Sequence, residues 1–197
     1  MLDEKTTPSA GIPEAAEQLI LVDEADRPIG PARKLEAHVS GDLHRAFSVF
    51  LFRSTGELLL QRRADSKYHS PGRWANTCCG HPRPFEDTVA AGERRLHEEL
   101  GIRATLHSGF QARYKEALEN GLIENELVHV LFGISDAAAV LNPDEASAVA
   151  TIGLTVLEQN IRTTPDQFAI WIVRYFERHA AEIAEHRDRV IGTHTPR

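Results

Sequence analysis

Two adjacent cysteines, Cys78 and Cys79, are the residues whose type and position first suggest chemistry. Neighbouring residues on an extended chain point to opposite sides, so a disulfide between them is sterically poor and both should be reduced thiols. Cys78 suits a packing role, whereas Cys79 abuts Gly80 and leads toward a charged helix. An unperturbed thiol, with a pKa of about 8.5, needs a positive field to act as a base and none to act as an acid. The direction of proton transfer at Cys79 stays open.

Carboxylates gather in two places that could support acid–base chemistry or metal binding. Glu124 and Glu126 are two positions apart, so on an extended strand both project from the same face. Glu98 and Glu99 follow Arg95 on the charged helix. Taken singly, Glu124 and Glu126 could be exposed carboxylates on a strand. Glu98 and Glu99 could lie on a solvated helix, whose i,i+4 ion pairs contribute about 0.2–0.5 kcal/mol each.

Turn signals and hydrophobic patterns predict the elements that must position these groups. Strands are expected at residues 18–22, 44–52, 57–63, 102–106, 110–115, 127–134 and 149–154. The second and third should form a hairpin, and Asn120 with Gly121 should turn another hairpin that brings Tyr114 beside Glu124 and Glu126.

Two helices are predicted among these strands. One begins at Asp87 or Thr88 and stops at Gly101, which can supply the left-handed residue of a helix end. The other begins at Thr164, where a capping box is followed by Pro165 at the first helical position. The order of elements predicts an α/β fold with a mixed sheet between helical layers.

Length and charge limit the class of protein. The 197 residues suit one domain at 17–186, with a loose leader at 1–16 and a polar tail at 187–197. A formal net charge of −7 argues against a broad basic surface for nucleic acid, so a small-molecule partner is expected. There is no apolar run of about 18 residues and no basic-then-apolar secretory pattern, so we expect a cytoplasmic protein without a membrane partner, and favour a monomer.

The charged helix and the turn before it carry a recognisable spacing. Gly80, Glu86 and the run from Arg94 to Ile102 resemble the Nudix box, in which a helix presents carboxylates to a divalent metal held on a diphosphate. The resemblance implies a Nudix-type α/β/α sandwich. Arg95 stands where the box has glutamate, which puts plain diphosphate hydrolysis in doubt.

Further motifs narrow the resemblance. Residues 74–82 read Trp-Ala-Asn-Thr-Cys-Cys-Gly-His-Pro, and residues 121–126 read Gly-Leu-Ile-Glu-Asn-Glu. With the altered box, residues 18–173 are similar to the type I isopentenyl-diphosphate delta-isomerase family, which interconverts isopentenyl and dimethylallyl diphosphate. The resemblance implies that Cys79 and Glu126 are the catalytic pair and that Tyr114 assists the glutamate.

The same resemblance implies two metals and a phosphate site. One divalent ion, Mn²⁺, Zn²⁺ or Mg²⁺, would be held by His38, His44, His81, Glu124 and Glu126. Mg²⁺ on the substrate diphosphate would be held by Glu99 and the backbone carbonyl of Cys79. The phosphates would be neutralised by Lys34, Arg63, Lys67 and Arg95. A mixed N/O ligand set without thiolates suits these ions and argues against a closed structural zinc site.

Two of these assignments have simple alternatives. Five residues separate His38 from His44, one fewer than in the family, so His38 could instead be an ordinary loop histidine. The resemblance places Trp171 against the substrate hydrocarbon, where its indole face could stabilise positive charge by about 2 kcal/mol. An aromatic residue on an apolar helix face is also a common core residue.

Moving the double bond of an unactivated alkene requires a proton on one side, loss of a proton on the other, and a carbocation-like state between. Water would quench that state, so the site must be closed and largely dry, with two acid–base groups flanking the substrate. Two other functions fit parts of the pattern: a Nudix hydrolase of another diphosphate, and a metal-bound diphosphate-binding protein without turnover. Arg95 argues against the first, and the set of Cys79, Tyr114 and Glu126 argues against the second.

Overall fold

The computed structural model describes residues 17–67, 69–118 and 121–193. The expected leader at 1–16 lies outside these residues. The strands are β1 Gln18–Val22, β2 Pro28–Arg33, β3 His44–Phe52, β4 Leu58–Arg63, β5 Trp74–Ala75, β6 Cys78–Gly80, β7 Leu106–Ala117, β8 Ile123–Ile134 and β9 Ala146–Ile152. The helices are α1 Lys34–Ser40, α2 Thr88–Leu100, α3 Leu154–Thr163, α4 Ile170–Arg178 and α5 Ala180–Thr193, with a short 3-10 turn, η2, at Pro165–Gln167.

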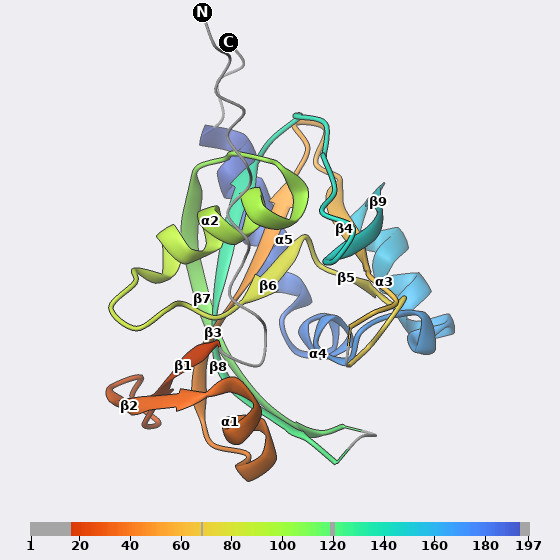
Figure 1. Ribbon diagram of the computed structural model, residues 1–197. Coiled ribbons are helices and arrows are strands. Elements are labelled where there is room, and N and C mark those ends of the chain that lie inside the picture. The colour runs from red at the N-terminus through yellow and green to blue at the C-terminus, as the bar shows by residue number, and fades with distance from the viewer. Residues whose placement is uncertain (1–16, 68, 119–120, 194–197) are drawn as a thin grey trace, which may run out of the picture.

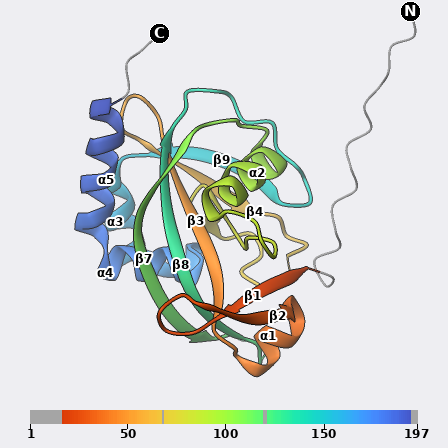
Figure 2. The same ribbon diagram turned by 90° about the vertical axis from the view of Figure 1, so that its left-hand side faces the viewer.

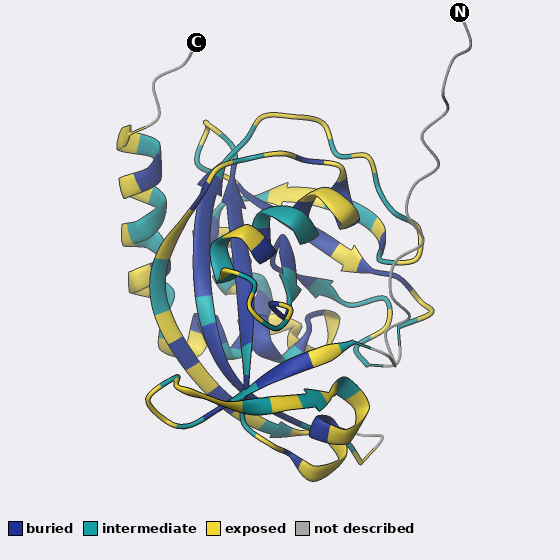
Figure 3. Cartoon of the chain, turned by 60° about the vertical axis from the view of Figure 1, so that its left-hand side comes forward, coloured by how far each residue is buried: buried dark blue, intermediate teal, exposed yellow. Residues whose placement is uncertain are grey.

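Strand β3 is the centre of a mixed sheet. It pairs in parallel with β8 from His44 to Phe52, and in antiparallel fashion with β6. It also meets β1 and β4, each at a single position, while β7 extends the sheet beyond β8 and β9 pairs with β4. A strand with neighbours on both edges and helices on both faces is expected to be mostly apolar, and residues 46–52 of β3 are all buried, with Ser48 as the one polar residue among them. Figure 3 shows the central strands in dark blue.

Helices cover both faces of this sheet. On one face, α2 packs Leu96 and Leu100 onto β3 and β8. On the other, α3, α4 and α5 contribute Leu157, Ile172 and Ile183 to a larger core. Figure 2 shows α2 on one side of the long strands and α5 on the other. The predicted α/β/α sandwich with a mixed sheet is confirmed.

The predicted ends of α2 are also confirmed. The Asp87 side chain accepts hydrogen bonds from the backbone N–H groups of Val89 and Ala90, which would otherwise lack partners in the first turn. Gly101 closes the helix in the left-handed conformation, with φ of 67°, and its N–H donates to the carbonyl of His97. Both ends of the helix that carries Arg95 and Glu99 are therefore fixed by hydrogen bonds.

The hairpin of β7 and β8 is confirmed, and its register pairs Tyr114 with Glu126. Strand β8 begins at residue 123, earlier than the predicted 127. The predicted strand at 102–106 is wrong except for its last residue, because residues 102–105 are an irregular connection and one strand then runs from Leu106 to Ala117. Residue 102 is nevertheless fully buried under α2.

The predicted hairpin of residues 44–52 and 57–63 forms only at its turn, where Phe52 pairs with Leu58. Beyond that point Thr77 lies between the two strands. Its hydroxyl accepts from the N–H of Leu51 at 2.9 Å and donates to the carbonyl of Leu59 at 2.5 Å. The segment that carries the cysteines thus enters the sheet between β3 and β4, which no local pattern indicates.

The predicted start of the last helix is wrong. Residues 165–167 form a 3-10 turn, the Thr164 side chain makes no cap, and α4 begins at Ile170. The N–H of Ala169 donates to the carbonyl of Trp74, and Phe168 bridges to Trp74, so the chain is held extended just before the helix. This contact with β5 overrides the local capping signal.

Three further differences concern helices. Helix α1 occupies a segment with no prediction, and α3 follows a strand that ends at Ile152 instead of residue 154. The expected polar tail at 187–197 begins inside α5, which continues to Thr193 and buries Val190 against the core. Figure 1 shows α1 with β1 and β2 at one end of the sheet, apart from the other helices. Among the described residues, the helices are all too short or too polar to span a membrane.

Candidate active site and metal centre

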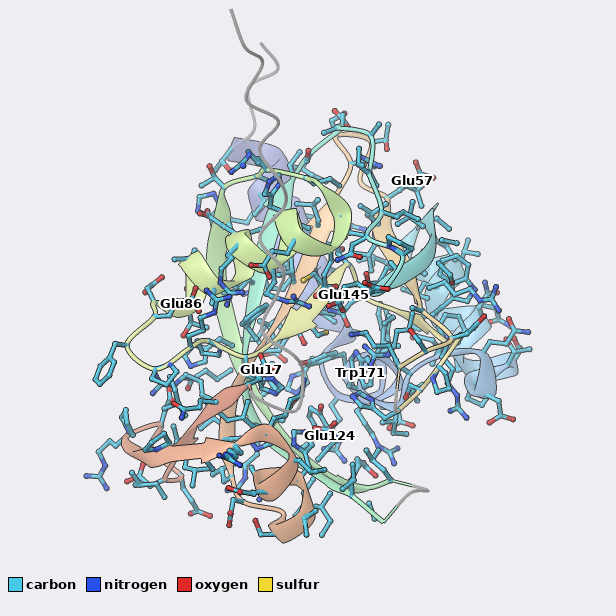
Figure 4. All side chains as sticks on the ribbon, in the orientation of Figure 1. Glu17, Glu57, Glu86, Glu124, Glu145 and Trp171 are labelled. Atoms are coloured by element: carbon cyan, nitrogen blue, oxygen red, sulfur yellow. The ribbon has the colours of Figure 1, made fainter. Side chains whose placement is uncertain are left out.

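One pocket collects most of the side chains that the sequence singled out. Its lining includes the predicted residues Lys34, Arg63, Lys67, Cys79, His81, Arg95, Glu99, Tyr114, Glu124, Glu126 and Trp171. These residues come from α1, β4, β6, α2, β7, β8 and α4, and from the loops between them. In Figure 4, Glu17, Glu124, Glu145 and Trp171 surround this region, whereas Glu57 and Glu86 lie at the periphery.

Three histidines and two glutamates form a buried cluster beside this pocket: His38, His44, His81, Glu124 and Glu126. In each of two overlapping groups of three, the possible ligand atoms lie within 4.8 Å of one another. The parallel pairing of β3 with β8 places His44 opposite Glu126, while α1 supplies His38, and His81 directly follows β6. The sequence-predicted set is therefore brought together, including His38.

The histidine rings are oriented so that one nitrogen of each faces a carboxylate. Nε2 of His38 lies 3.3 Å from Glu124, and Nε2 of His81 lies 3.1 Å from Glu126. Nε2 of His44 lies 3.7 Å from Glu126. The Nδ1 atoms of His38 and His44 point away and donate to the backbone carbonyls of Lys34 and Asp42, at 2.6 and 2.9 Å.

A divalent metal fits this cluster. Within the described residues, Nε2 of His44 and Oε2 of Glu124 are buried without a hydrogen-bond partner, although such atoms are normally satisfied. Imidazole and carboxylate donors together suit Zn²⁺, Mn²⁺ or Mg²⁺. A cation at the shared centre would satisfy both orphaned atoms at once.

Glu126 is held from two sides. One oxygen, Oε1, faces His44 and His81. The other, Oε2, accepts a hydrogen bond of 2.6 Å from the buried hydroxyl of Tyr114. Burial raises the pKa of Glu126, but its interactions with His44 and His81 outweigh burial and hold this pKa well below its usual range. The carboxylate is therefore ionised, with a fixed orientation.

Cys79 lies among polar side chains, at the edge of β3 opposite to β8. Its sulfur is 3.4 Å from the hydroxyl of Ser48, and it contacts both ends of the Asn76 amide at 3.2 and 3.3 Å. Burial raises the pKa of the Cys79 thiol to about 12, so the group carries its proton at neutral pH. Cys78 is buried against α2 on the other face of the sheet, and neither cysteine forms a disulfide.

Asn76, which sequence reasoning missed, connects the Cys79 thiol with the indole of Trp171. Besides its contacts with Cys79, it donates to the carbonyl of Val49 and accepts from the indole N–H of Trp171 at 3.1 Å. Trp171 belongs to the larger core and also lines the pocket, so a place beside the substrate and a place in the core are compatible for this residue. Asn76 stands inside the motif at residues 74–82, which could have marked it, but an uncharged amide suggests no acid–base role by itself.

A network of charges forms another wall. Arg95 contacts Glu99 at 2.7 Å and Glu145 at 3.1 Å, and Lys67 contacts Glu145 at 2.6 Å. Gln61 donates to the second oxygen of Glu99 at 3.0 Å. Sequence reasoning missed Glu145, which lies in the loop before β9. Only its place after a Pro-Asp turn marked it as a loop carboxylate.

Two more lining residues were missed. His69 packs edge-on against the Trp171 ring at 5.5 Å, on the ring that also carries the Arg63 guanidinium at 5.2 Å. Glu17, the residue before β1, forms an ion pair of 2.9 Å with Lys34. Both residues stand alone in the sequence, outside any motif, so only the fold brings them to the pocket.

Comparisons with known proteins show what this chain as a whole is similar to. The NUDIX domain model matches residues 42–178. An isopentenyl-diphosphate Delta-isomerase of Pectobacterium atrosepticum is 48% identical over 161 residues, covering 82% of this chain and 90% of that protein. Isopentenyl-diphosphate Delta-isomerase 1 of Aromatoleum aromaticum is 48% identical over 174 residues, covering 88% and 98%.

Solved structures bear on the fold alone. The crystal structure of DR0079 from Deinococcus radiodurans is similar with a TM-score of 0.67 at 21% identity, covering 82% of this chain and 98% of that one. The MutT protein from Methanosarcina mazei has a TM-score of 0.58 at 20% identity, covering 72% and 95%.

Proposed function

Because this chain belongs to the isopentenyl-diphosphate Delta-isomerase family and carries a NUDIX domain, we propose how its pocket performs that reaction. The protein is an isomerase that interconverts isopentenyl diphosphate and dimethylallyl diphosphate. The reaction moves a carbon–carbon double bond by one position. It adds a proton to the terminal carbon of the alkene and removes one from the carbon next to the diphosphate-bearing carbon.

Cys79 and Glu126 are the two groups that exchange protons with the substrate. The observation that carries this proposal is that both line one pocket, yet come from β6 and β8, which flank β3 on opposite edges. A protonated thiol and an ionised carboxylate form one donor and one acceptor before any substrate binds. Each turnover shifts a proton from one group to the other, so both must re-equilibrate with solvent.

The surroundings protect the positive charge that develops at the tertiary carbon. Tyr114 is 7% exposed and Trp171 is 5% exposed, so little of either is open to bulk water. The indole face offers electrons to the cation, which is worth about 2 kcal/mol when water is excluded. Asn76 holds the indole and the thiol in one frame, so the charge forms between fixed groups.

The cluster of His38, His44, His81, Glu124 and Glu126 is proposed to hold Mn²⁺, Zn²⁺ or Mg²⁺. Such an ion supplies charge that stabilises the ionised form of Glu126 and fixes its position. Glu99 and the backbone carbonyl of Cys79 would hold Mg²⁺ on the diphosphate. Lys34, Arg63, Lys67 and Arg95 would bind the phosphate oxygens, for which guanidinium groups are well shaped. A monomer in the cytoplasm stays a prediction.

Arg95 separates this function from hydrolysis. Its guanidinium lies within 3.1 Å of both Glu99 and Glu145. In the Nudix box this position is a glutamate, whose carboxylate could bind a metal. A fixed positive charge there binds phosphate but cannot ligate a second cation or activate water. The arrangement therefore favours holding the diphosphate intact while the hydrocarbon reacts.

The test is a proton NMR time course of isopentenyl diphosphate with the protein and Mg²⁺ in D₂O. We expect dimethylallyl diphosphate to appear with deuterium at the position that gains a proton, and no release of phosphate. Release of inorganic phosphate or pyrophosphate would instead identify a hydrolase. Binding of the substrate with no change in its spectrum would identify a binding protein without turnover.

A further inference from the structure

The three histidines of the cluster are not supported equally, and the difference points to a residue with no assigned role. A histidine that ligates a metal through Nε2 must carry its proton on Nδ1, and that N–H is almost always fixed by a carboxylate, a carbonyl or water. His38 and His44 meet this requirement through backbone carbonyls at 2.6 and 2.9 Å. His81 does not.

The Nδ1 atom of His81 is buried and has no hydrogen-bond partner among the described residues. The ring is 7% exposed, and its Nε2 faces Glu126 at 3.1 Å. The carboxylate paired with Nδ1 is that of Glu17, whose Oε1 lies 3.9 Å away. A shift of about 1 Å would bring these atoms to the usual hydrogen-bond distance.

Glu17 is placed by the sheet to make this contact. It directly precedes β1, and its backbone carbonyl accepts from the N–H of Lys34 at 2.9 Å, which extends the pairing of β1 with β2 by one step. Its two carboxylate oxygens have separate neighbours. Oε2 accepts from the Lys34 ammonium at 2.9 Å, and Oε1 faces His81.

We propose that Glu17 is a positioning residue that fixes the His81 imidazole for metal binding and links the metal centre to the phosphate site through Lys34. This inference rests on the proposed metal centre and deepens it. Lys34 has a second link to the same centre, because its backbone carbonyl accepts from His38. Glu17, just before β1, and Lys34, at the start of α1, therefore orient two ligands and supply one phosphate-binding cation.

The inference predicts a loss of metal affinity that depends on the hydrogen-bond acceptor at residue 17. Removing an outer partner of a metal-ligating histidine typically weakens metal binding by about 10- to 100-fold. Glu17→Ala should produce a loss of this size. Glu17→Gln should lose less, because its amide oxygen can accept the Nδ1 proton as the backbone carbonyls do for His38 and His44.

The experiment titrates Zn²⁺ against a chromophoric chelator for the metal-stripped full chain and each variant. Glu24→Ala is the matched control, because Glu24 lies in the β1–β2 turn and its ion pair with Arg113 is exposed. A second readout is the Nδ1–H resonance of His81 in Zn²⁺-loaded, ¹⁵N-histidine-labelled protein, which should move in Glu17→Ala while those of His38 and His44 stay in place.

The results separate this inference from the isomerase function. Glu17→Ala with unchanged Zn²⁺ affinity and an unmoved His81 resonance overturns the role of Glu17, whatever the activity of the wild-type chain. If the wild-type chain fails to isomerise isopentenyl diphosphate, the proposed reaction is rejected. If Glu17→Ala nevertheless loses Zn²⁺ affinity, the role of Glu17 is supported. Circular dichroism on each variant shows whether a loss of affinity reflects unfolding, which would also count against a positioning role.

Discussion

The contact between Tyr114 and Glu126 allows a quantitative prediction for one hydroxyl group. Tyr114→Phe removes the donor that lies 2.6 Å from Oε2 of Glu126 and changes nothing else in size. Tyr114 is only 7% exposed and its hydrogen bond to Glu126 is buried, so water cannot simply replace the hydroxyl. Because the acceptor is an ionised carboxylate, the bond contributes about 1.5–3 kcal/mol. If the carboxylate must be held in one orientation to react, this energy is lost from the transition state.

That energy corresponds to a fall in kcat of about 13- to 160-fold, at 1.36 kcal/mol for each factor of ten. KM should change little, because the residues expected to bind the diphosphate lie on other elements. The assay is the initial rate of dimethylallyl diphosphate formation, followed by NMR over a range of substrate concentrations. Thermal unfolding of the variant shows whether its structure is intact.

Tyr175→Phe is a matched comparison. Tyr175 is also buried, and its hydroxyl donates at 2.8 Å to Ser48, a neutral acceptor beside Cys79. A neutral hydrogen bond contributes about 0.5–1.5 kcal/mol, or about 2- to 13-fold in rate. A Tyr114→Phe variant with kcat within twofold of wild type, or with a smaller loss than Tyr175→Phe, would refute the role assigned to Tyr114.

Three further predictions concern the thiol, the metal and the core. Cys79→Ala should reduce isomerisation below detection while isothermal titration still detects diphosphate binding, and normal turnover would reject the role of the thiol. Glu126→Gln should lose both activity and bound metal, with Glu116→Gln on the partner strand as a control, and elemental analysis showing unchanged metal content would count against ligation. Gly109→Ala should lower the free energy of unfolding by about 1–3 kcal/mol, because a Cβ there would lie 2.3–2.6 Å from the buried Phe132 ring; guanidinium unfolding with an unchanged midpoint would contradict this.

The parts of the fold that sequence predicted well are those with local causes. The ends of α2 follow from Asp87 and Gly101, which act on backbone groups within a few residues. The β7–β8 hairpin was predicted from the Asn120-Gly121 pair in the sequence. The parallel pairing of β3 with β8 joins residues about 80 positions apart, and no local pattern encodes such a partner choice. The capping signal at Thr164 failed for the same reason, since the contact of Ala169 with Trp74 decides where α4 begins.

The candidate site shows a similar division. The histidines and glutamates of the cluster could be proposed from the sequence because family motifs and spacing mark them. Glu17 and Glu145 could not, because each is a single polar residue in a loop or at a strand end, and Asn76 was overlooked although it stands inside the motif at residues 74–82. The fold alone brings them to their neighbours in the site, since Asn76 and Glu145 contact Cys79 and Arg95 directly, and Glu17 lies 3.9 Å from His81.

The parallel pairing of β3 with β8 also governs when the cluster can form during protein synthesis. His44 leaves the ribosome 82 residues before Glu126, its partner across the two strands (126 − 44 = 82). At about 5–20 residues per second, the delay is roughly 4–16 s. During that time the nascent chain exposes imidazoles without the carboxylates that complete the cavity. The two glutamates can join the three histidines only after β8 has been made, so a polypeptide truncated before β8 would carry the histidines, the thiol and the acidic helix without either carboxylate.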